Sequence, residues 1–177
     1  LVRCLLDEVF GRENFVAVIA FQTAANQNTE RLQRLFDHLL WYARDIEHLK
    51  VRKLFRERTV DEVKAVFPRI DPEGRRFKAS DVSSRSSEEV ARFRAAERLT
   101  VENRAMMFPD DFPVTEIHNV WDDTVFGHAK AKEKVYAVQT NTKVVERCIL
   151  MTTDPGDLVF DPTCGSGTTA YCAEKWG

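Results

Sequence analysis

The strongest signal in this sequence is one stretch near its C-terminal end: Gly156-Asp157-Leu158-Val159-Phe160-Asp161-Pro162-Thr163-Cys164-Gly165-Ser166-Gly167-Thr168-Thr169. Its apolar part, Leu158-Val159-Phe160, predicts a short buried strand that ends on Asp161. A Gly-x-Gly loop follows, and the residues from Thr168 to Trp176 predict a helix. This order of strand, acidic residue, glycine loop and helix is typical of a nucleotide-like site at the carboxyl end of a parallel strand.

The loop has the chemistry to hold an anionic group. Gly165 and Gly167 allow positive φ and a close approach of the backbone to a ligand. The helix N-terminus offers N–H groups and partial positive charge to a carboxylate or phosphate, and the hydroxyls of Thr168 and Thr169 add donors. A phosphate-binding P-loop needs a lysine after Gly167, and a dinucleotide fingerprint needs a third glycine; the sequence has neither. A tight turn without a ligand is the alternative for Gly-Ser-Gly alone.

The string from Asp161 to Thr169 resembles the S-adenosylmethionine-binding motif of the N6-adenine and N4-cytosine DNA methyltransferases. The usual form of that motif is Asp-Pro-Phe-x-Gly-Ser-Gly-Thr-Thr, and Thr163 stands where Phe is common. Upstream, the segment 139–147 is similar to the motif that precedes this loop in the permuted subclass. There a Thr-x-Lys-Pro element opens a helix beside the methionine end of the cofactor; Lys143 keeps the lysine and Val144 replaces the proline. The resemblance implies that S-adenosylmethionine is the cofactor and that it is bound by Thr142, Lys143, Asp161, Pro162, Thr163, Cys164, Gly165, Ser166, Gly167, Thr168 and Thr169.

The chain divides into three blocks. The first, 1–50, is expected to form part of a methyltransferase α/β core, because its pattern alternates between helix and strand. The expected elements are a helix at Leu1–Phe10, a strand at Asn14–Phe21, a helix at Thr29–Phe36 and a strand at Leu39–Ala43. The third block, 129–177, is the cofactor-binding part of the core, with a helix at Thr142–Met151 before the glycine loop.

The middle block, 51–128, differs in composition from the other two and is expected to be an insertion attached to the sheet. It is rich in arginine and in proline-containing turns, and Ser86 with Glu89 predicts a capping box for a helix to about Leu99. Between residues 50 and 98 there are 14 Lys and Arg against 9 Asp and Glu, although the chain has a net charge of −2. Such a block is either an electrostatic footprint for nucleic acid or a solvated surface. In the family, this place in the order belongs to the target-recognition region.

Further segments extend the resemblance. The segment 1–21 is similar to the helix and strand that follow the catalytic motif in the permuted subclass. Segments 119–121 and 135–143 most resemble the modification subunits of type III restriction systems, which implies adenine N6 as the methylated atom. Double-stranded DNA is then the expected partner, and a restriction subunit and a second copy of the chain are candidate protein partners. Candidate DNA contacts are Phe21 and Gln22 at a strand end and Arg75, Arg76 and Lys78 in the basic block.

The catalytic motif of the family is not present in the sequence. That motif is an Asp, Asn or Ser followed by Pro-Pro-Tyr or Pro-Pro-Phe, whereas all six prolines here are isolated. In the permuted subclass the motif lies upstream of the helix at 1–10, and the ribose-binding acidic residue lies beyond Gly177. We therefore expect a fragment, truncated at both ends, that methylates nothing by itself. C5-cytosine methylation is disfavoured because no Pro-Cys occurs.

Several other classes are disfavoured by composition. No run of about 18 apolar residues and no signal peptide occur, so neither a membrane span nor export is expected. The cysteines form no Cys-x-x-Cys pair and no histidine clusters near them, which predicts reduced thiols, no metal site and a cytoplasmic location.

The sequence thus predicts an α/β fold: part of a Rossmann-like S-adenosylmethionine-dependent methyltransferase fold with an inserted target-recognition region. The main alternative is a non-catalytic DNA- or subunit-binding remnant of such an enzyme. Methyl transfer to RNA or a small molecule and a nicotinamide-dependent activity are further alternatives; the missing third glycine disfavours the nicotinamide enzyme.

Overall fold

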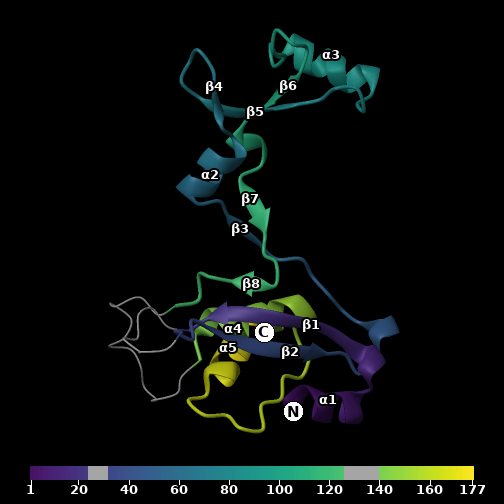
Figure 1. The fold of residues 1–177 in the computed structure, drawn as a ribbon. Coiled ribbons are helices and arrows are strands. Elements are labelled where there is room, and N and C mark those ends of the chain that lie inside the picture. The colour runs from purple at the N-terminus through teal and green to yellow at the C-terminus, as the bar shows by residue number, and fades with distance from the viewer. Residues whose placement is uncertain (24–31, 126–139) are drawn as a thin grey trace. The chain divides into compact units, whose positions relative to one another are not determined.

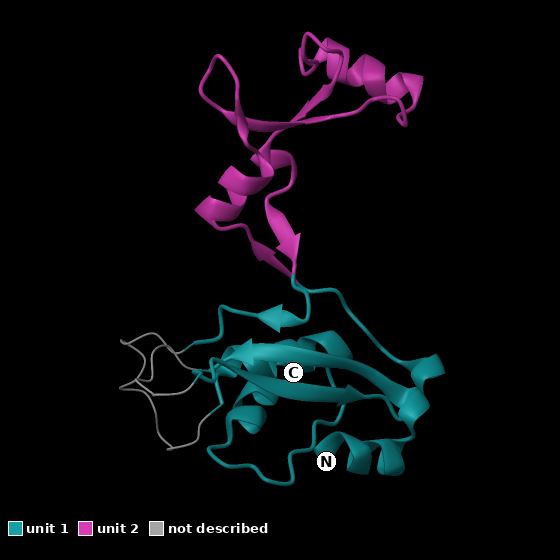
Figure 2. Ribbon diagram, viewed as in Figure 1, with its two compact units in different colours: residues 1–54, 117–177 teal, residues 55–116 magenta. Residues whose placement is uncertain are grey.

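A computed structural model describes residues 1–23, 32–125 and 140–177. The chain forms two compact units (Figure 2). Unit 1 combines residues 1–54 with 117–177, and unit 2 is the continuous segment 55–116. Unit 2 is shorter at both ends than the expected insertion at 51–128, because Ile117 donates its N–H to the carbonyl of Leu54 and the next residues join the sheet of unit 1.

A three-stranded sheet forms the centre of unit 1 (Figure 1). Strand β1 (Phe15–Gln22) lies between β2 (Phe36–Tyr42), which is antiparallel to it, and β8 (Val120–Trp121), which is parallel. Both strands expected in the first 50 residues are therefore confirmed, and so is the α/β character of the chain. The sheet is mixed, because β1 has one antiparallel and one parallel neighbour.

The prediction of a helix at Thr29–Phe36 is wrong for residues 32–36. Residues 29–31 lie outside the described residues, residues 32–35 form no helix, and Phe36 is already the first residue of β2. Phe36 pairs with Gln22 of β1. This cross-strand ladder determines the conformation of Phe36, which the local sequence alone does not reveal.

Helix α4 (Thr142–Thr152) packs on the sheet of unit 1, and helix α5 (Thr168–Trp176) packs on α4 (Figure 1). Val144 of α4 packs against Ile19 of β1 and Trp121 of β8, and these three buried side chains form the core cluster. The helices expected at 142–151 and 168–176 are thus confirmed, and they position the segments that the sequence assigns to the cofactor.

Helix α1 (Val2–Phe10) is also confirmed, and it ends where the sequence predicts. Gly11 has a φ of 86° and donates its N–H to the carbonyl of Asp7, which closes the last turn. Tyr42 of β2 anchors this helix, because its hydroxyl donates to the Asp7 carboxylate and its ring centroid lies 5.7 Å from that of Phe10.

The short strand expected at Leu158–Phe160 does not form. These residues have no regular structure, and the side chains of Leu158 and Phe160 are 92% and 81% exposed. A strand requires a neighbour that accepts and donates its backbone hydrogen bonds, and within the described parts of the chain no strand pairs with this segment. The glycine loop therefore follows a segment that pairs with no strand in the described parts of the chain.

Unit 2 contains two small antiparallel sheets and two helices. Strands β3 (Phe55–Glu57) and β7 (Val114–Glu116) form one sheet, and β4 (Arg69–Ile70), β5 (Arg76–Ser80) and β6 (Ala105–Met107) form the other. The helices are α2 (Val60–Val66) and α3 (Ser87–Ala95), and a 3-10 turn spans Pro109–Asp111. Buried aromatic side chains, chiefly Phe67, Phe77 and Phe108, fill its interior.

The capping box predicted for α3 is confirmed. The Ser86 hydroxyl accepts from the N–H of Glu89, and the Glu89 carboxylate accepts from the N–H of Ser86. The helix ends at Ala95 and not near Leu99, because Leu99 forms an isolated bridge with Ala105. None of the helices in residues 1–23, 32–125 and 140–177 is long and apolar enough to cross a membrane.

Candidate cofactor site

Asp161 organises the glycine loop of unit 1. Its Oδ1 accepts from the backbone N–H groups of Thr163 and Cys164, both at 3.0 Å, and its Oδ2 accepts from the Thr169 hydroxyl at 2.7 Å. The Thr169 hydrogen bond, followed by those from Cys164 and Thr163, lowers the pKa of Asp161 to about 2. The carboxylate is therefore ionised at neutral pH, and it joins the start of the loop to the first turn of α5.

The loop backbone turns through the left-handed region. Cys164, Gly165 and Gly167 have φ values of 52°, 53° and 76°. A Cβ atom placed on either glycine would meet no atom within 4 Å, so both glycines face open space. Because glycine adopts this conformation without steric cost, the sequence can bring bare backbone to the surface at this point.

The N-terminus of α5 opens on the same loop. Gly167 is the capping residue and no side chain caps the helix, so the first N–H groups of α5 are not engaged by a capping side chain. The hydroxyls of Ser166 and Thr168 lie 2.8 Å apart, and Thr168 is buried whereas residues 162–166 are exposed. Free N–H groups and two hydroxyls thus converge at a helix end with partial positive charge.

The first turn of α4 lies beside the middle of α5. The buried thiol of Cys172 lies 3.8 Å from the carbonyl oxygen of Thr142, and Lys175 binds Glu146 at 2.6 Å. Burial raises the pKa of the Cys172 thiol, which keeps it protonated as a weak donor. These contacts hold α4 against α5, and the assignment of 142–143 and 161–169 to one cofactor stays a prediction.

Lys143 is held by a residue that sequence reasoning missed. Its ammonium group donates to the carboxylate of Asp123 at 3.3 Å and to the carbonyl of Asp123 at 3.2 Å. Arg147, one turn further along α4, binds the same carboxylate through two hydrogen bonds of 2.8 and 2.7 Å. The i, i+4 spacing of these two cations, which places them on one face of α4, is the signal that could have indicated a shared acidic partner.

The two candidate base contacts lie at the end of β1. Phe21 pairs with Trp121 of β8 and packs, half-buried, against the core cluster. The carbonyl of Gln22 accepts from the hydroxyl of Thr124 at 2.7 Å. The strand end is therefore tied to the segment that follows β8, and the Phe21 ring contributes to the core.

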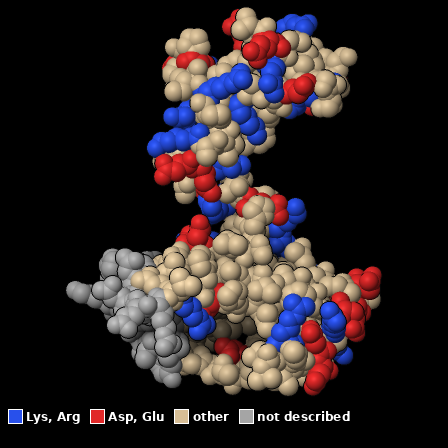
Figure 3. All heavy atoms as spheres, viewed as in Figure 1, with Lys and Arg blue, Asp and Glu red and all other residues tan. Residues whose placement is uncertain are grey.

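The candidate DNA contacts of unit 2 lie on and next to β5. Arg75 binds Asp71 at 2.8 Å and its guanidinium lies 4.7 Å from the Phe108 ring centroid. Arg76 donates to the Phe67 carbonyl at 3.4 Å, and the Lys78 ammonium lies 5.0 Å from the ring centroid of Phe112. On the face drawn in Figure 3, Lys and Arg gather over unit 2 with acidic residues among them.

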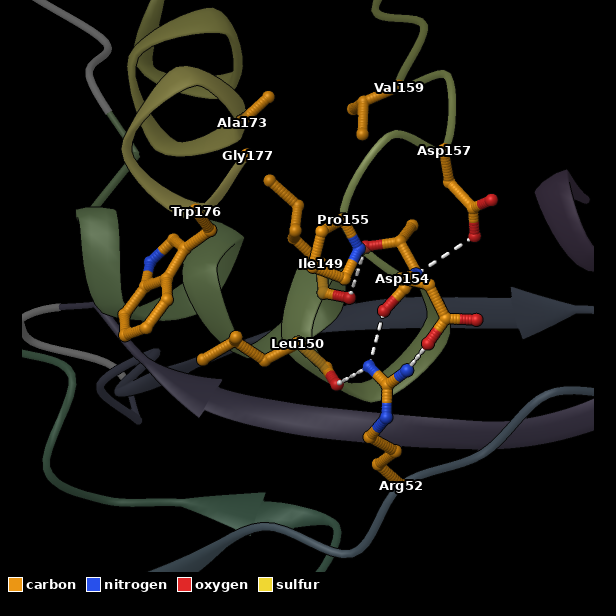
Figure 4. Close-up of a pocket in the computed structure, with 11 residues that line it drawn as sticks. Arg52, Ile149, Leu150, Asp154, Pro155, Asp157, Val159, Ala173, Trp176 and Gly177 are labelled. Carbon is orange, nitrogen blue, oxygen red and sulfur yellow. Dashed lines mark hydrogen bonds and ion pairs between the residues drawn. The ribbon is translucent and has the colours of Figure 1, made fainter.

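A separate cavity of about 220 Å³ lies at the other ends of the two helices (Figure 4). Its wall includes Leu150 of α4, Trp176 of α5 and the unpaired Val159. Arg52 closes one side, where it donates to the carbonyl of Leu150 at 3.4 Å and forms an ion pair with Asp154. The candidate cofactor residues do not line this cavity, so it is a feature distinct from the loop. Among residues 1–23, 32–125 and 140–177, no three His, Cys, Asp or Glu side chains gather in a way that could hold a metal ion.

Known proteins match the chain along its length. The model of the N6/N4 DNA methylase family matches residues 2–177. The Type II methyltransferase M.EcaI of Enterobacter cloacae is 23% identical over 211 residues, which cover 99% of this chain and 46% of that protein. The Type II methyltransferase M.BglII of Bacillus subtilis is 36% identical over 57 residues, or 32% of this chain and 16% of that protein. The chain thus spans less than half the length of these relatives, and it belongs to the N6/N4 DNA methylase family.

Proposed function

We propose that this chain binds S-adenosylmethionine at the glycine loop, as part of an enzyme that methylates an exocyclic amine of a DNA base. The observation that carries the proposal is the left-handed loop that Asp161 fixes at the N-terminus of α5, a helix end that no side chain caps. The carboxylate of the methionine moiety suits this helix end, which offers N–H groups and partial positive charge. Membership of the family supports the choice of cofactor.

Asp161 shapes the site in this proposal. Its carboxylate accepts four hydrogen bonds from Thr163, Cys164 and Thr169, which takes up most of its acceptor capacity. The ligand-facing groups are then the backbone of Cys164 to Gly167, the hydroxyls at the start of α5, and Thr142 and Lys143 on α4. A rigid loop of this kind positions the methyl donor before the base arrives, which lowers the entropic part of the barrier.

The reaction proposed for the enzyme is a direct transfer. The target base leaves the duplex, its amine attacks the methyl carbon of the sulfonium group, the S–C bond breaks, and the amine loses a proton. We propose adenine N6 as the target, on the resemblance to type III modification subunits; both relatives named above are Type II methyltransferases. The partial Rossmann-like fold and the permuted order are part of the same proposal.

We further propose that these 177 residues do not transfer a methyl group by themselves. The sequence contains no Pro-Pro-Tyr or Pro-Pro-Phe motif to hold the amine and stack on the base. Purified chain mixed with S-adenosylmethionine and double-stranded DNA is expected to leave the DNA unmethylated. Methylated adenine or cytosine in that DNA, detected by mass spectrometry of its nucleosides, would contradict this.

Unit 2, the compact part of the segment 51–128, is the proposed target-recognition region. The support is its separate fold and the gathering of cations around β5, where Arg75, Arg76 and Lys78 would contact phosphates of double-stranded DNA. The second candidate function, a non-catalytic DNA- or subunit-binding module, rests on the same unit. A restriction subunit and a second copy of the chain are the protein partners proposed, and the cytoplasm is the proposed location.

Calorimetric titration of the full chain with S-adenosylmethionine tests the cofactor assignment. Gly167→Ala adds a methyl group to the loop at a φ of 76° and is expected to weaken binding at least about tenfold. Gly74→Ala is the matched control, because Gly74 has a φ of 82° and equally open surroundings but lies in unit 2. The control is expected to bind as the wild type does. Absence of binding by the wild-type chain would overturn the proposal.

A further inference from the structure

Asp123 joins two cations of α4 to the segment that follows β8. Arg147 holds both carboxylate oxygens, at 2.8 and 2.7 Å, and Lys143 holds one of them together with the Asp123 carbonyl. The Arg147 side chain is 9% exposed, that of Asp123 is 32% exposed and that of Lys143 is 53% exposed. The Asp123–Arg147 ion pair is therefore the buried interaction, and Lys143 is the more exposed partner of Asp123.

The surroundings of Arg147 fix its position. Its guanidinium lies 5.2 Å from the ring centroid of Trp121, a side chain that is 1% exposed and donates its indole N–H to the carbonyl of His118. A buried guanidinium requires an anionic partner, because an unpaired buried charge is costly. A pair of parallel hydrogen bonds to a carboxylate also fixes the orientation of the two side chains relative to each other. The pair thus sets the rotation of α4 against the segment that follows β8.

A second link runs from the next residue. The Thr124 hydroxyl donates to the carbonyl of Gln22 at the end of β1, and the Thr124 carbonyl accepts from the side chain of Asn141. Asn141 caps α4, because its side-chain oxygen accepts from the N–H of Lys143 at 2.9 Å. Asp123 and Thr124 together therefore tie the first turn of α4 to the end of β1.

We infer that Asp123 is a positioning residue of the cofactor site, which holds the Lys143 ammonium and the first turn of α4 in place for the methionine end of the cofactor. The inference rests on the proposed function. Two of the three Lys143 donors point at Asp123, which leaves one for a ligand carboxylate. Asp123 acts through Lys143 and has no contact with the cofactor of its own. Its loss releases the lysine and reduces affinity.

A double-mutant cycle on the full chain tests this. The dissociation constant for S-adenosylmethionine is measured for the wild type, Asp123→Asn, Lys143→Met and the double variant, at a temperature at which circular dichroism shows each to be folded. Each single substitution is expected to weaken binding about 5- to 10-fold, and the double variant to be no weaker than Lys143→Met, because both changes remove one interaction. Asp111→Asn is the control: it breaks a comparable ion pair, Arg98–Asp111 at 2.8 Å, in unit 2 and is expected to leave affinity unchanged.

The outcomes are separable. Wild-type affinity in Asp123→Asn, with or without lower stability, overturns the inference and leaves the proposed function standing. Additive losses in the double variant also overturn it, because Asp123 would then not act through Lys143. If Asp123→Asn does not fold, Lys143→Met decides the matter: the lysine is half exposed, so its loss spares stability, and unchanged affinity there contradicts the inference. A wild-type chain that does not bind the cofactor refutes the proposed function itself.

Discussion

Two substitutions that break the Asp123–Arg147 ion pair are expected to destabilise unit 1 by unequal amounts. In Asp123→Asn, a guanidinium that is 9% exposed stays beside Trp121 without its carboxylate. Removing one partner of a buried pair costs about 3–5 kcal/mol, and because Asp123 is 32% exposed we expect about 2–4 kcal/mol here.

The reverse change is expected to cost less. Arg147→Met keeps an apolar side chain of similar length against Trp121, and Asp123 retains Lys143 and access to water. The cost of breaking a pair comes from the charge that is left buried without a partner, and Asp123 keeps a partner and solvent, so we expect about 0–2 kcal/mol. Removing the Asp123 carboxylate is thus predicted to lower the free energy of unfolding more than removing the Arg147 guanidinium, because Arg147 is the more deeply buried of the two.

Urea unfolding at pH 7, followed by tryptophan fluorescence, measures both values. The three tryptophans, Trp41, Trp121 and Trp176, all belong to unit 1, so the signal reports on that unit. Asp111→Asn, which breaks the Arg98 pair in unit 2, is the control and is expected to leave this transition unchanged. A loss in Arg147→Met that equals or exceeds the loss in Asp123→Asn would refute the reasoning.

The loss of stability in Asp123→Asn is expected to depend on pH. Burial by itself would raise the pKa of Asp123, but the hydrogen bonds and charge of Arg147, with a contribution from Lys143, hold that pKa below its ordinary value. A carboxyl with a depressed pKa contributes stability that is complete above its unfolded pKa, about 3.9, and is lost as the pH falls through the folded value. The difference between wild type and Asp123→Asn is therefore expected to be the same at pH 7 and pH 6 and to shrink below about pH 4.

Two further predictions concern the loop and unit 2. At pH 8, iodoacetamide is expected to modify the exposed Cys164 well before Cys148, because burial raises the pKa of the Cys148 thiol to about 11. S-adenosylmethionine is expected to slow the modification of Cys164, and peptide mass spectrometry measures both rates. Equal rates of Cys164 modification with and without the cofactor would argue against binding at the loop. Arg75→Gln and Lys78→Gln are each expected to weaken binding to double-stranded DNA and to reduce the slope of log affinity against log salt by about 1, as measured by fluorescence anisotropy. Unchanged slopes in both variants would remove these residues from the interface.

The parts of the fold that the sequence predicted well are those that local interactions determine. Gly11 ends α1 because its φ is 86°, and Ser86 with Glu89 starts α3, since a helix end depends on a few neighbouring residues. The glycine loop was predictable for the same reason. Asp161, Gly165 and Gly167 define it within a few residues, and its hydrogen bonds span no more than eight positions.

The parts that the sequence predicted poorly depend on distant partners. Leu158–Phe160 has the composition of a strand, but no described strand pairs with it, and Phe36 joins β2 because Gln22 of β1 is opposite it. Asp123 and Arg147 are 24 residues apart, and the spacing of Lys143 and Arg147 indicates an acidic partner without indicating which residue it is. Sequence reasoning therefore identified Lys143 as a candidate ligand but missed the residue that holds it.

Hydrogen–deuterium exchange with and without S-adenosylmethionine shows directly whether the glycine loop binds the cofactor, because it locates the bound molecule on the chain. Slower exchange is expected in residues 161–169 and in the N-terminal part of α4, 142–147, with unchanged exchange throughout unit 2. Protection confined to residues 55–116, or no protection at 161–169 when the cofactor is saturating, would contradict binding at the loop.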